Sequence, residues 1–248
     1  MTKSVDLRQE MHLSSFGLKC VAIIAMTIDH IGYLLIPPDK SMLFRMVGRI
    51  AFPIFCFLIV EGYFYTRNIT KYALRLFAFA LISEVPYDLA VKKSVFNMSR
   101  QNVFFTLLIG LLTIAFINKC TGSFLSIAKK YKPKTARLVF FISVLAFICS
   151  FATLASLYLA LKLRVDYSLI GLPTILSFYV FRRYQVVGLS SIAFINLRLS
   201  GGFQAPAVLA AIPLLLYNGE KGKPMRWLFY IFYPAHLMCL YLLRLLIY

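Results

Sequence analysis

Long apolar segments recur along this chain from Gly17 to its last residue, and this pattern limits the fold more than any other feature. A helix needs about 20 mainly apolar residues to cross the hydrocarbon core of a bilayer. Within that core the protein itself must satisfy each backbone polar group, which favours helices for segments of this length. The sequence therefore predicts an all-α, polytopic integral membrane helical bundle.

Composition agrees with a lipid environment. Of the 248 residues, 60% are hydrophobic and 15% are charged, whereas soluble domains carry roughly 25% charged residues. The net charge is +18, and most of the basic residues lie between apolar segments. This placement is typical of topology signals rather than of nucleic-acid binding. The five cysteines are scattered without paired spacing, so we predict neither disulfides nor a metal site.

We predict about nine spans, with a range of eight to ten. The sixth to eighth are short and contain glycine or proline, which is typical of half-helices, tilted segments or re-entrant pieces. The predicted spans are Gly17–Ile36, Met42–Tyr65, Tyr72–Val91, Val103–Asn118, Arg137–Leu161, Tyr167–Phe181, Val186–Leu199, Phe203–Tyr217 and Trp227–Tyr248. Residues 1–16 are expected to form a cytoplasmic N-terminal segment, and residues 17–248 a single transmembrane domain.

The distribution of positive charge predicts the orientation. With the N-terminus inside, the inner loops hold fourteen Lys and Arg residues, against seven in the outer loops and span ends. The cytoplasmic loops of membrane proteins carry such an excess. We therefore expect the N-terminus to be cytoplasmic and the C-terminus to be external.

An ionisable pair, Asp29-His30, lies inside the first span. One such residue at a helix centre costs roughly 2.5–3.5 kcal/mol on insertion scales, so it usually serves ion, proton or substrate chemistry. Lys19 shares a helical face with His30, about 16 Å nearer the start of the helix. It either belongs to a polar track or extends its amine to the interface. Asp29 points about 100° away from His30, so we expect it to orient another group.

The second span carries two arginines one turn apart, Arg45 and Arg49, with Glu61 deep towards its other end. The arginines either reach the interface, hold an anionic acceptor or steady Asp29. In the third span Glu84 and Asp88 share a face. Two carboxylates there need cations, and the two arginines are the available partners. Both a structural ion pair and paired acid–base chemistry remain open for them.

Two polar pairs mark the outer boundary, and one further histidine lies in the last span. Gln101-Asn102 enters the fourth span and Asp166-Tyr167 enters the sixth, where both pairs can act as helix caps. His236 follows Pro234 by two residues. A single histidine on an apolar helix is usually a core residue, but a second intramembrane histidine beside a proline also fits a functional role.

Several segments together resemble one known family. The stretch LKCVAIIAMTIDHIGYLL resembles the opening of the TraX family. Further matches, in the expected order, are GRIAFPIFCFLIVEGYFYTRN, KYALRLFAFALISEVPYDL, QNVFFTLLIGLL, VDYSLIGLPTILSFYVFR and WLFYIFYPAHLMCLYL. The family's namesake acetylates the amino terminus of a conjugative pilin in bacteria. The family also looks like a relative of the polytopic acyltransferases that modify sugars and of the lysosomal heparan glucosaminide acetyltransferase.

In the sugar O-acyltransferases, a basic residue, ten intervening residues and a histidine mark the first span, and Lys19 and His30 match that spacing. The run that begins at Arg49 and ends at Glu61-Gly62-Tyr63 is similar to their second span. Many of those relatives carry a serine at the position of Glu61, so the role of that serine does not transfer.

The resemblance implies acyl transfer in the bacterial cytoplasmic (inner) membrane. Acetyl-CoA would come from the cytoplasm, and the acceptor would be an amine or hydroxyl of a protein, peptide or glycan at or beyond the outer face. His30 is then the base or transient acyl carrier, with Asp29 as an orienting group. Candidates for the donor's phosphates, or alternatively for lipid head groups, are Lys19, Arg67, Lys71 and Arg75.

Two other functions remain open. A proton-coupled transporter or exporter would use Glu84, Asp88 and His236 as a relay. A non-catalytic assembly partner of a secretion or conjugation apparatus would use none of this chemistry. Stabilisation by CoA distinguishes the acyltransferase from both.

Overall fold

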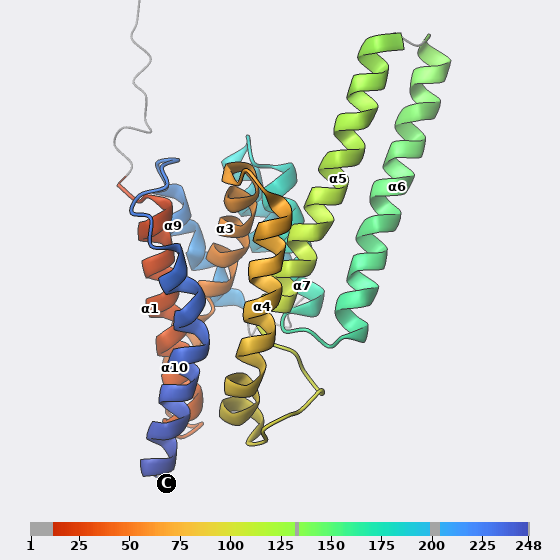
Figure 1. The fold of residues 1–248 in the computed structure, drawn as a ribbon. Helices are drawn as coiled ribbons and strands as arrows, with labels where there is room; N and C mark the ends of the chain where they lie inside the picture. Colours follow the sequence, from red (N-terminus) through yellow and green to blue (C-terminus); the bar gives the residue numbers. More distant parts are fainter. Residues whose placement is uncertain (1–11, 132–133, 199–203, 248) are drawn as a thin grey trace, which may run out of the picture.

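A computed structural model describes residues 12–131, 134–198 and 204–247, and these residues form a bundle of helices (Figure 1). Within the described parts there is no strand, only two isolated β-bridges. The all-α prediction is therefore confirmed. Most of the expected N-terminal segment 1–16 lies outside the described residues, as do part of the predicted seventh and eighth spans and the last residue.

The helices follow one another with short connections. Their bounds are α1 Ser15–Leu34, α2 Met42–Gly48, α3 Ala51–Tyr65, α4 Ile69–Tyr87, the π-helix η2 Asp88–Lys92, α5 Val103–Tyr131, α6 Thr135–Lys162, α7 Ser168–Val180, α8 Gln185–Arg198, the 3₁₀-helix η3 Ala205–Ala210, α9 Ala211–Leu215 and α10 Arg226–Ile247.

Among the described residues, five helical segments are long and apolar enough to cross a membrane. They are Ser15–Leu34, Met42–Tyr65, Val103–Tyr131, Thr135–Lys162 and Trp227–Ile247, and they match the predicted first, second, fourth, fifth and last spans. The remaining predicted spans fall on α4, α7, α8 and on η3 with α9, which are shorter or less apolar. A membrane bundle is thus supported, while the count of nine stays a prediction.

Helix α5 is longer than its predicted span. The apolar run ends at Asn118, but the helix continues to Tyr131. Polar residues lower the hydropathy after Asn118, but α5 continues as one arm of the hairpin in which α6 packs against it. The predicted boundary followed hydropathy alone and could not take this packing into account.

The predicted second span is interrupted near its start. α2 ends at Gly48 and α3 begins at Ala51. Pro53 has no N–H to donate to the carbonyl of Arg49, and its ring clashes with that carbonyl, so the helix cannot run straight through. Pro53 therefore separates the predicted second span into two helices.

The two ends of the bundle are named here by helix α1. The N-face is the end where α1 begins at Ser15 and α10 begins at Arg226, and the C-face is the end where α1 finishes at Leu34 (Figure 1). α10 lies against both α1 and α4. The long α5–α6 hairpin stands beside the bundle and rises past it at the N-face (Figure 1). Only Ala160 of α6 is buried, so most of this helix is free to contact lipid.

A close approach between α1 and α2 determines how these two helices pack against each other. A Cβ atom added at Gly48 would lie 2.1 Å from the Cβ of Asp29, far inside van der Waals contact. Glycine is therefore required for the α2 backbone to rest on Asp29. This contact brings the side chains of α2 to the polar residues of α1.

Candidate functional site

Asp29 is the centre of a buried charge cluster. Its side chain binds two guanidinium groups, with Oδ2 2.9 Å from Nη1 of Arg45 and Oδ1 2.7 Å from Nη2 of Arg49. Arg49 also donates from Nη1 to the hydroxyl of Tyr167 at 3.4 Å and from Nε to the carbonyl of Arg45 at 3.2 Å. Asp29 is only 7% exposed. The side chain adjacent to His30 thus orients arginines rather than the histidine.

His30 pairs instead with the histidine of the last helix. Its Nδ1 lies 2.8 Å from Nε2 of His236, and Nδ1 of His236 lies 2.8 Å from the carbonyl oxygen of Phe232. A carbonyl only accepts, so Nδ1 of His236 carries a proton. In the neutral pair, Nε2 of His236 then accepts from Nδ1 of His30. The lone pair on Nε2 of His30 is consequently available as a base.

The carboxylates of the third predicted span do not meet Arg45 and Arg49, contrary to the prediction. Glu84 accepts from the backbone N–H of Asn102 at 2.9 Å, and Asp88 accepts from that of Asn97 at 2.6 Å. Helix rotation, which residue spacing does not specify, turns both carboxylates towards the 94–102 loop. The described contacts give them a structural role and do not link them to His236 as a relay.

The polar pairs predicted at the outer boundary tie two loops together at the C-face. Gln101 exchanges backbone hydrogen bonds with the 164–166 segment, at 3.1 and 2.9 Å. Arg100 forms an ion pair with Asp166. Burial raises the pKa of Asp166 while Arg100 opposes that shift, and Asp166 in turn raises the pKa of Arg100. This junction holds the hydroxyl of Tyr167 within hydrogen-bond distance of Arg49.

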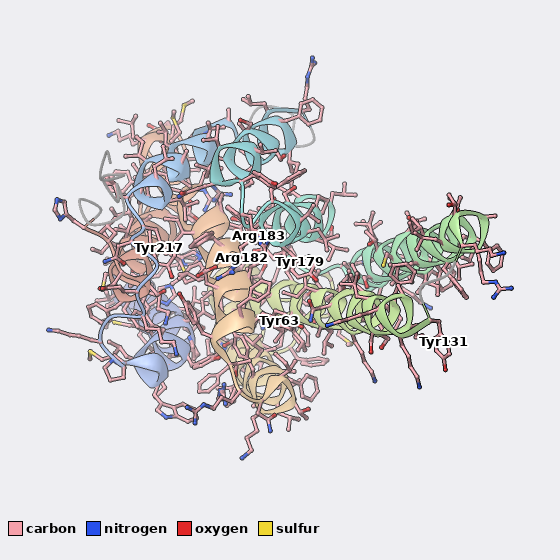
Figure 2. All side chains as sticks on the ribbon, turned by 90° about the horizontal axis from the view of Figure 1, so that it is seen from above. Tyr63, Tyr131, Tyr179, Arg182, Arg183 and Tyr217 are labelled. Atoms are coloured by element: carbon pink, nitrogen blue, oxygen red, sulfur yellow. The ribbon has the colours of Figure 1, made fainter. Side chains whose placement is uncertain are left out.

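Glu61 organises the opposite end of the bundle. Nε of Arg182 lies 2.7 Å from its Oε1, and the hydroxyl of Tyr217 donates to its Oε2 at 3.1 Å. The Tyr217 hydroxyl also lies 3.0 Å from Oγ of Ser15. Figure 2 views the bundle from this end and labels both Arg182 and Tyr217. Glu61 is 4% exposed, so this pairing compensates a buried charge.

A strap, defined as residues 216–222, crosses the N-face and pairs with the start of the chain. Leu13 donates to the carbonyl of Leu216 at 3.0 Å and accepts from the N–H of Asn218 at 2.9 Å, and Ser15 donates to the carbonyl of Glu220 at 2.8 Å. The strap thereby places Lys221 next to the first helix.

A cavity of about 320 Å³ opens beside the strap between α1, α3, α4, α5 and α10. Three cations line it: Lys19, Arg75 and Lys221. Each lies over an aromatic ring, at 5.1, 5.7 and 4.9 Å from the centroid respectively. Nε of Arg75 is buried without a hydrogen-bond partner. No carboxylate is among the described residues that line this N-face cavity, so it suits an anionic ligand with an apolar arm.

Two of the predicted donor-binding residues lie elsewhere. Arg67 and Lys71 are exposed on the N-face and are not among the residues that line the cavity. Lys221 was missed because it sits in a loop whose lysines indicated only orientation. The strap's pairing with residues 13–16 has no sequence signature that would have revealed its position.

Three aromatic rings separate the N-face cavity from the two histidines. Phe104 and Tyr230 line the cavity. Behind them, Tyr233 lies with its ring centroid 5.1 Å from Phe104, 5.7 Å from His236 and 6.4 Å from His30. Along α10, Tyr230, Tyr233 and His236 follow one another at single turns. We call Phe104, Tyr230 and Tyr233 the aromatic partition.

A second cavity, of about 630 Å³, lies at the C-face where α1 and α10 end. Its lining includes Tyr33, Lys93 and Arg244. Tyr33 follows His30 by three residues, so both lie on one face of α1. The C-face cavity thus begins one turn of α1 beyond His30. Within the described residues, no group of three or more His, Cys, Asp or Glu side chains is placed to hold a metal ion.

Comparison with known proteins identifies related sequences. The family model for "TraX protein" matches residues 14–244. The chain is 29% identical over 266 aligned residues to a probable fimbrial assembly protein FimC, serogroup H1, of Dichelobacter nodosus, covering 97% of each chain. It is 53% identical over 55 residues to an uncharacterized protein of Rickettsia prowazekii (strain Madrid E), covering 22% of this chain and 21% of that one. No solved structure matches.

Proposed function

Because the chain belongs to the TraX protein family, we propose that it is an integral-membrane acyltransferase that moves an acetyl group from acetyl-CoA to an amine or hydroxyl acceptor. The observation that carries this proposal is the N-face cavity. Its three cations suit the phosphates of CoA, and its apolar walls suit the pantetheine arm. The cavity leads to the aromatic partition, behind which the histidine pair lies.

The histidine pair supplies the proton transfers. Nε2 of His30 removes the proton from the acceptor's nitrogen or oxygen as that atom attacks the carbonyl carbon of the thioester. The carbon–sulfur bond breaks, the new acyl bond forms, and CoA leaves as a thiolate. The imidazolium then returns its proton to the thiolate, so charge and protons balance. Asp29 compensates Arg45 and Arg49, which otherwise would disfavour the imidazolium.

The acceptor is proposed to approach from the C-face. The C-face cavity is lined by Tyr33, one turn of α1 after His30, and it lies at the end of the bundle opposite to the donor. The relative named as a probable fimbrial assembly protein favours a fimbrial or pilin-like subunit as acceptor, with an envelope glycan as the alternative. In this arrangement donor and acceptor reach the histidine pair from opposite sides of the bacterial inner membrane.

Orientation provides the first test. In a chain whose own cysteines are replaced, Asp39→Cys at the C-face is expected to react with a membrane-impermeant maleimide in intact cells. Lys129→Cys at the end of α5 is expected to react only after permeabilisation, because the N-face carries the excess of positive charge. Both positions are exposed, so their reactivity reports sidedness. Labelling of Lys129→Cys from outside intact cells would reverse the proposed donor side.

Donor binding provides the second test. CoA is expected to raise the unfolding temperature of the purified protein, because a ligand of the native state stabilises it. Lys19→Ala, Arg75→Ala and Lys221→Ala should each weaken CoA binding about tenfold, as expected for loss of one charge-assisted contact. Arg183→Ala is the matched control, since Arg183 is an exposed cation of the same face (Figure 2) that does not line the cavity. Absence of stabilisation by CoA and acetyl-CoA would contradict the proposed function.

A further inference from the structure

We infer that Phe104 sets the size of the acyl group that this protein transfers and restricts it to groups about as small as acetyl. The inference rests on the proposed acyl transfer, and it concerns the end of the N-face cavity that is nearest to the histidines. Phe104 lies in one of the segments that resemble the family, but the resemblance assigns no role to its ring. Its significance comes from its place between the cavity and the histidine pair.

Phe104 stands where a longer acyl chain would have to lie. Its ring lines the cavity on one side and is 7% exposed. On the other side it meets Tyr233 edge to face, at 5.1 Å and 83°, and it lies 6.3 Å from Tyr230. A thioester whose phosphates are held at the N-face points its acyl group at this ring. Carbons beyond the acetyl methyl would therefore overlap a packed aromatic side chain.

The start of α5 holds Phe104 firmly. The backbone N–H of Phe104 donates to Oδ1 of Asn102 at 3.0 Å. Asn102 is fully buried and donates from Nδ2 to the carbonyl of Ala80 at 2.8 Å, while its own N–H is bound by Glu84. The first turn of α5 is thus fastened to α4 by a side chain with no room to move. A wall fixed in this way can select by size.

The α10 side of the partition is less constrained. Pro234 lies inside α10 and has no N–H to donate to the carbonyl of Tyr230 one turn earlier. Tyr230 and Tyr233 therefore lie on the turn of α10 where the proline interrupts the regular i to i−4 pattern. In the proposed function, a displacement of this turn opens the path to His30. Phe104 is the fixed edge of that opening, and it limits which acyl groups pass.

The experiment measures donor preference. Radiolabelled acetyl-, butyryl- and hexanoyl-CoA are offered to the purified protein together with an envelope fraction from a strain that lacks it. The wild-type protein should prefer acetyl-CoA at least tenfold over hexanoyl-CoA. Phe104→Ala should reduce this preference at least tenfold by accepting the longer chains, and Phe104→Leu should reduce it partly. Stabilisation of the protein by each acyl-CoA gives a readout that needs no acceptor.

The controls separate this inference from the proposed function. Leu111→Ala removes a buried side chain of the same helix that is not among the residues lining the cavity, and it should leave the preference unchanged. If Phe104→Ala fails to fold, the donor preference of Phe104→Leu tests the inference instead. Folded variants that transfer acetyl with the wild-type preference would overturn the role of Phe104 alone. A wild-type protein that transfers hexanoyl as well as acetyl would do the same. A wild-type protein that transfers no acyl group would instead overturn the acyltransferase proposal, and the inference with it.

Discussion

A His30→Ala variant is expected to fold and to lose acyl transfer by at least about 100-fold, the usual contribution of a positioned general base. The reason is the hydrogen-bond chain from Phe232 through His236, which leaves Nε2 of His30 as the available lone pair. Transfer from radiolabelled acetyl-CoA to the envelope fraction measures the loss. CoA binding should remain, because His30 does not line the N-face cavity.

Two further variants identify what His30 does. His30→Gln keeps a hydrogen-bonding side chain but cannot take a proton at neutral pH, so it should be as inactive as His30→Ala. His12→Ala removes an exposed histidine outside the helices and should leave transfer unchanged. Near-normal transfer by His30→Gln would reduce His30 to a structural partner of His236 and move the search for a base to His236.

Asp29→Asn is expected to destabilise the protein by about 3–5 kcal/mol, the range measured when one partner of a buried ion pair is removed. Arg45 and Arg49 would keep their charges in a buried site without the carboxylate that both of them contact. Thermal unfolding in detergent measures the effect. Asp39→Asn is the matched control, because Asp39 lies exposed in the loop that follows the same helix.

A double-mutant cycle makes this prediction specific to the charge cluster. Arg49→Gln alone should also destabilise, since it leaves Asp29 with one cation instead of two. The combination of Asp29→Asn and Arg49→Gln should cost less than the sum of the single changes, because fewer charges remain uncompensated. Strict additivity, or an Asp29→Asn variant as stable as Asp39→Asn, would show that the cluster is held by other contacts.

Much of the fold could be predicted from the sequence because a membrane-spanning helix is recognised by the length of its apolar segment alone. An apolar run of sufficient length has to be helical, so α1, α5, α6 and α10 could be placed from composition alone. Three polar residues inside those runs could be recognised as candidates because placing an ionisable side chain in the membrane costs free energy. They are Asp29, His30 and His236. The TraX resemblance, which the match over residues 14–244 confirms, drew on the same segments.

The partners of these residues could not be predicted, because spacing along a helix does not specify how the helices are rotated against one another. Arg45 and Arg49 had two possible partners, Asp29 or the carboxylates at Glu84 and Asp88. The choice depends on Gly48, whose missing side chain lets α2 rest on Asp29. Lys221 was overlooked for a related reason, since its place is set by backbone pairing of the strap with residues 13–16.

The pairing of the first helix with the last has a consequence for how the protein matures in the membrane. His30 and His236 are separated by 206 positions, and Lys19 and Lys221 likewise come from opposite parts of the chain. A nascent chain that has inserted α1 through α9 therefore has half of the histidine pair and an N-face cavity without the wall that α10 provides. Under the acyl transfer proposed above, activity begins only with insertion of the final helix, because α10 supplies His236 and part of the cavity wall. An incompletely synthesised chain in the membrane would then be unable to consume acetyl-CoA.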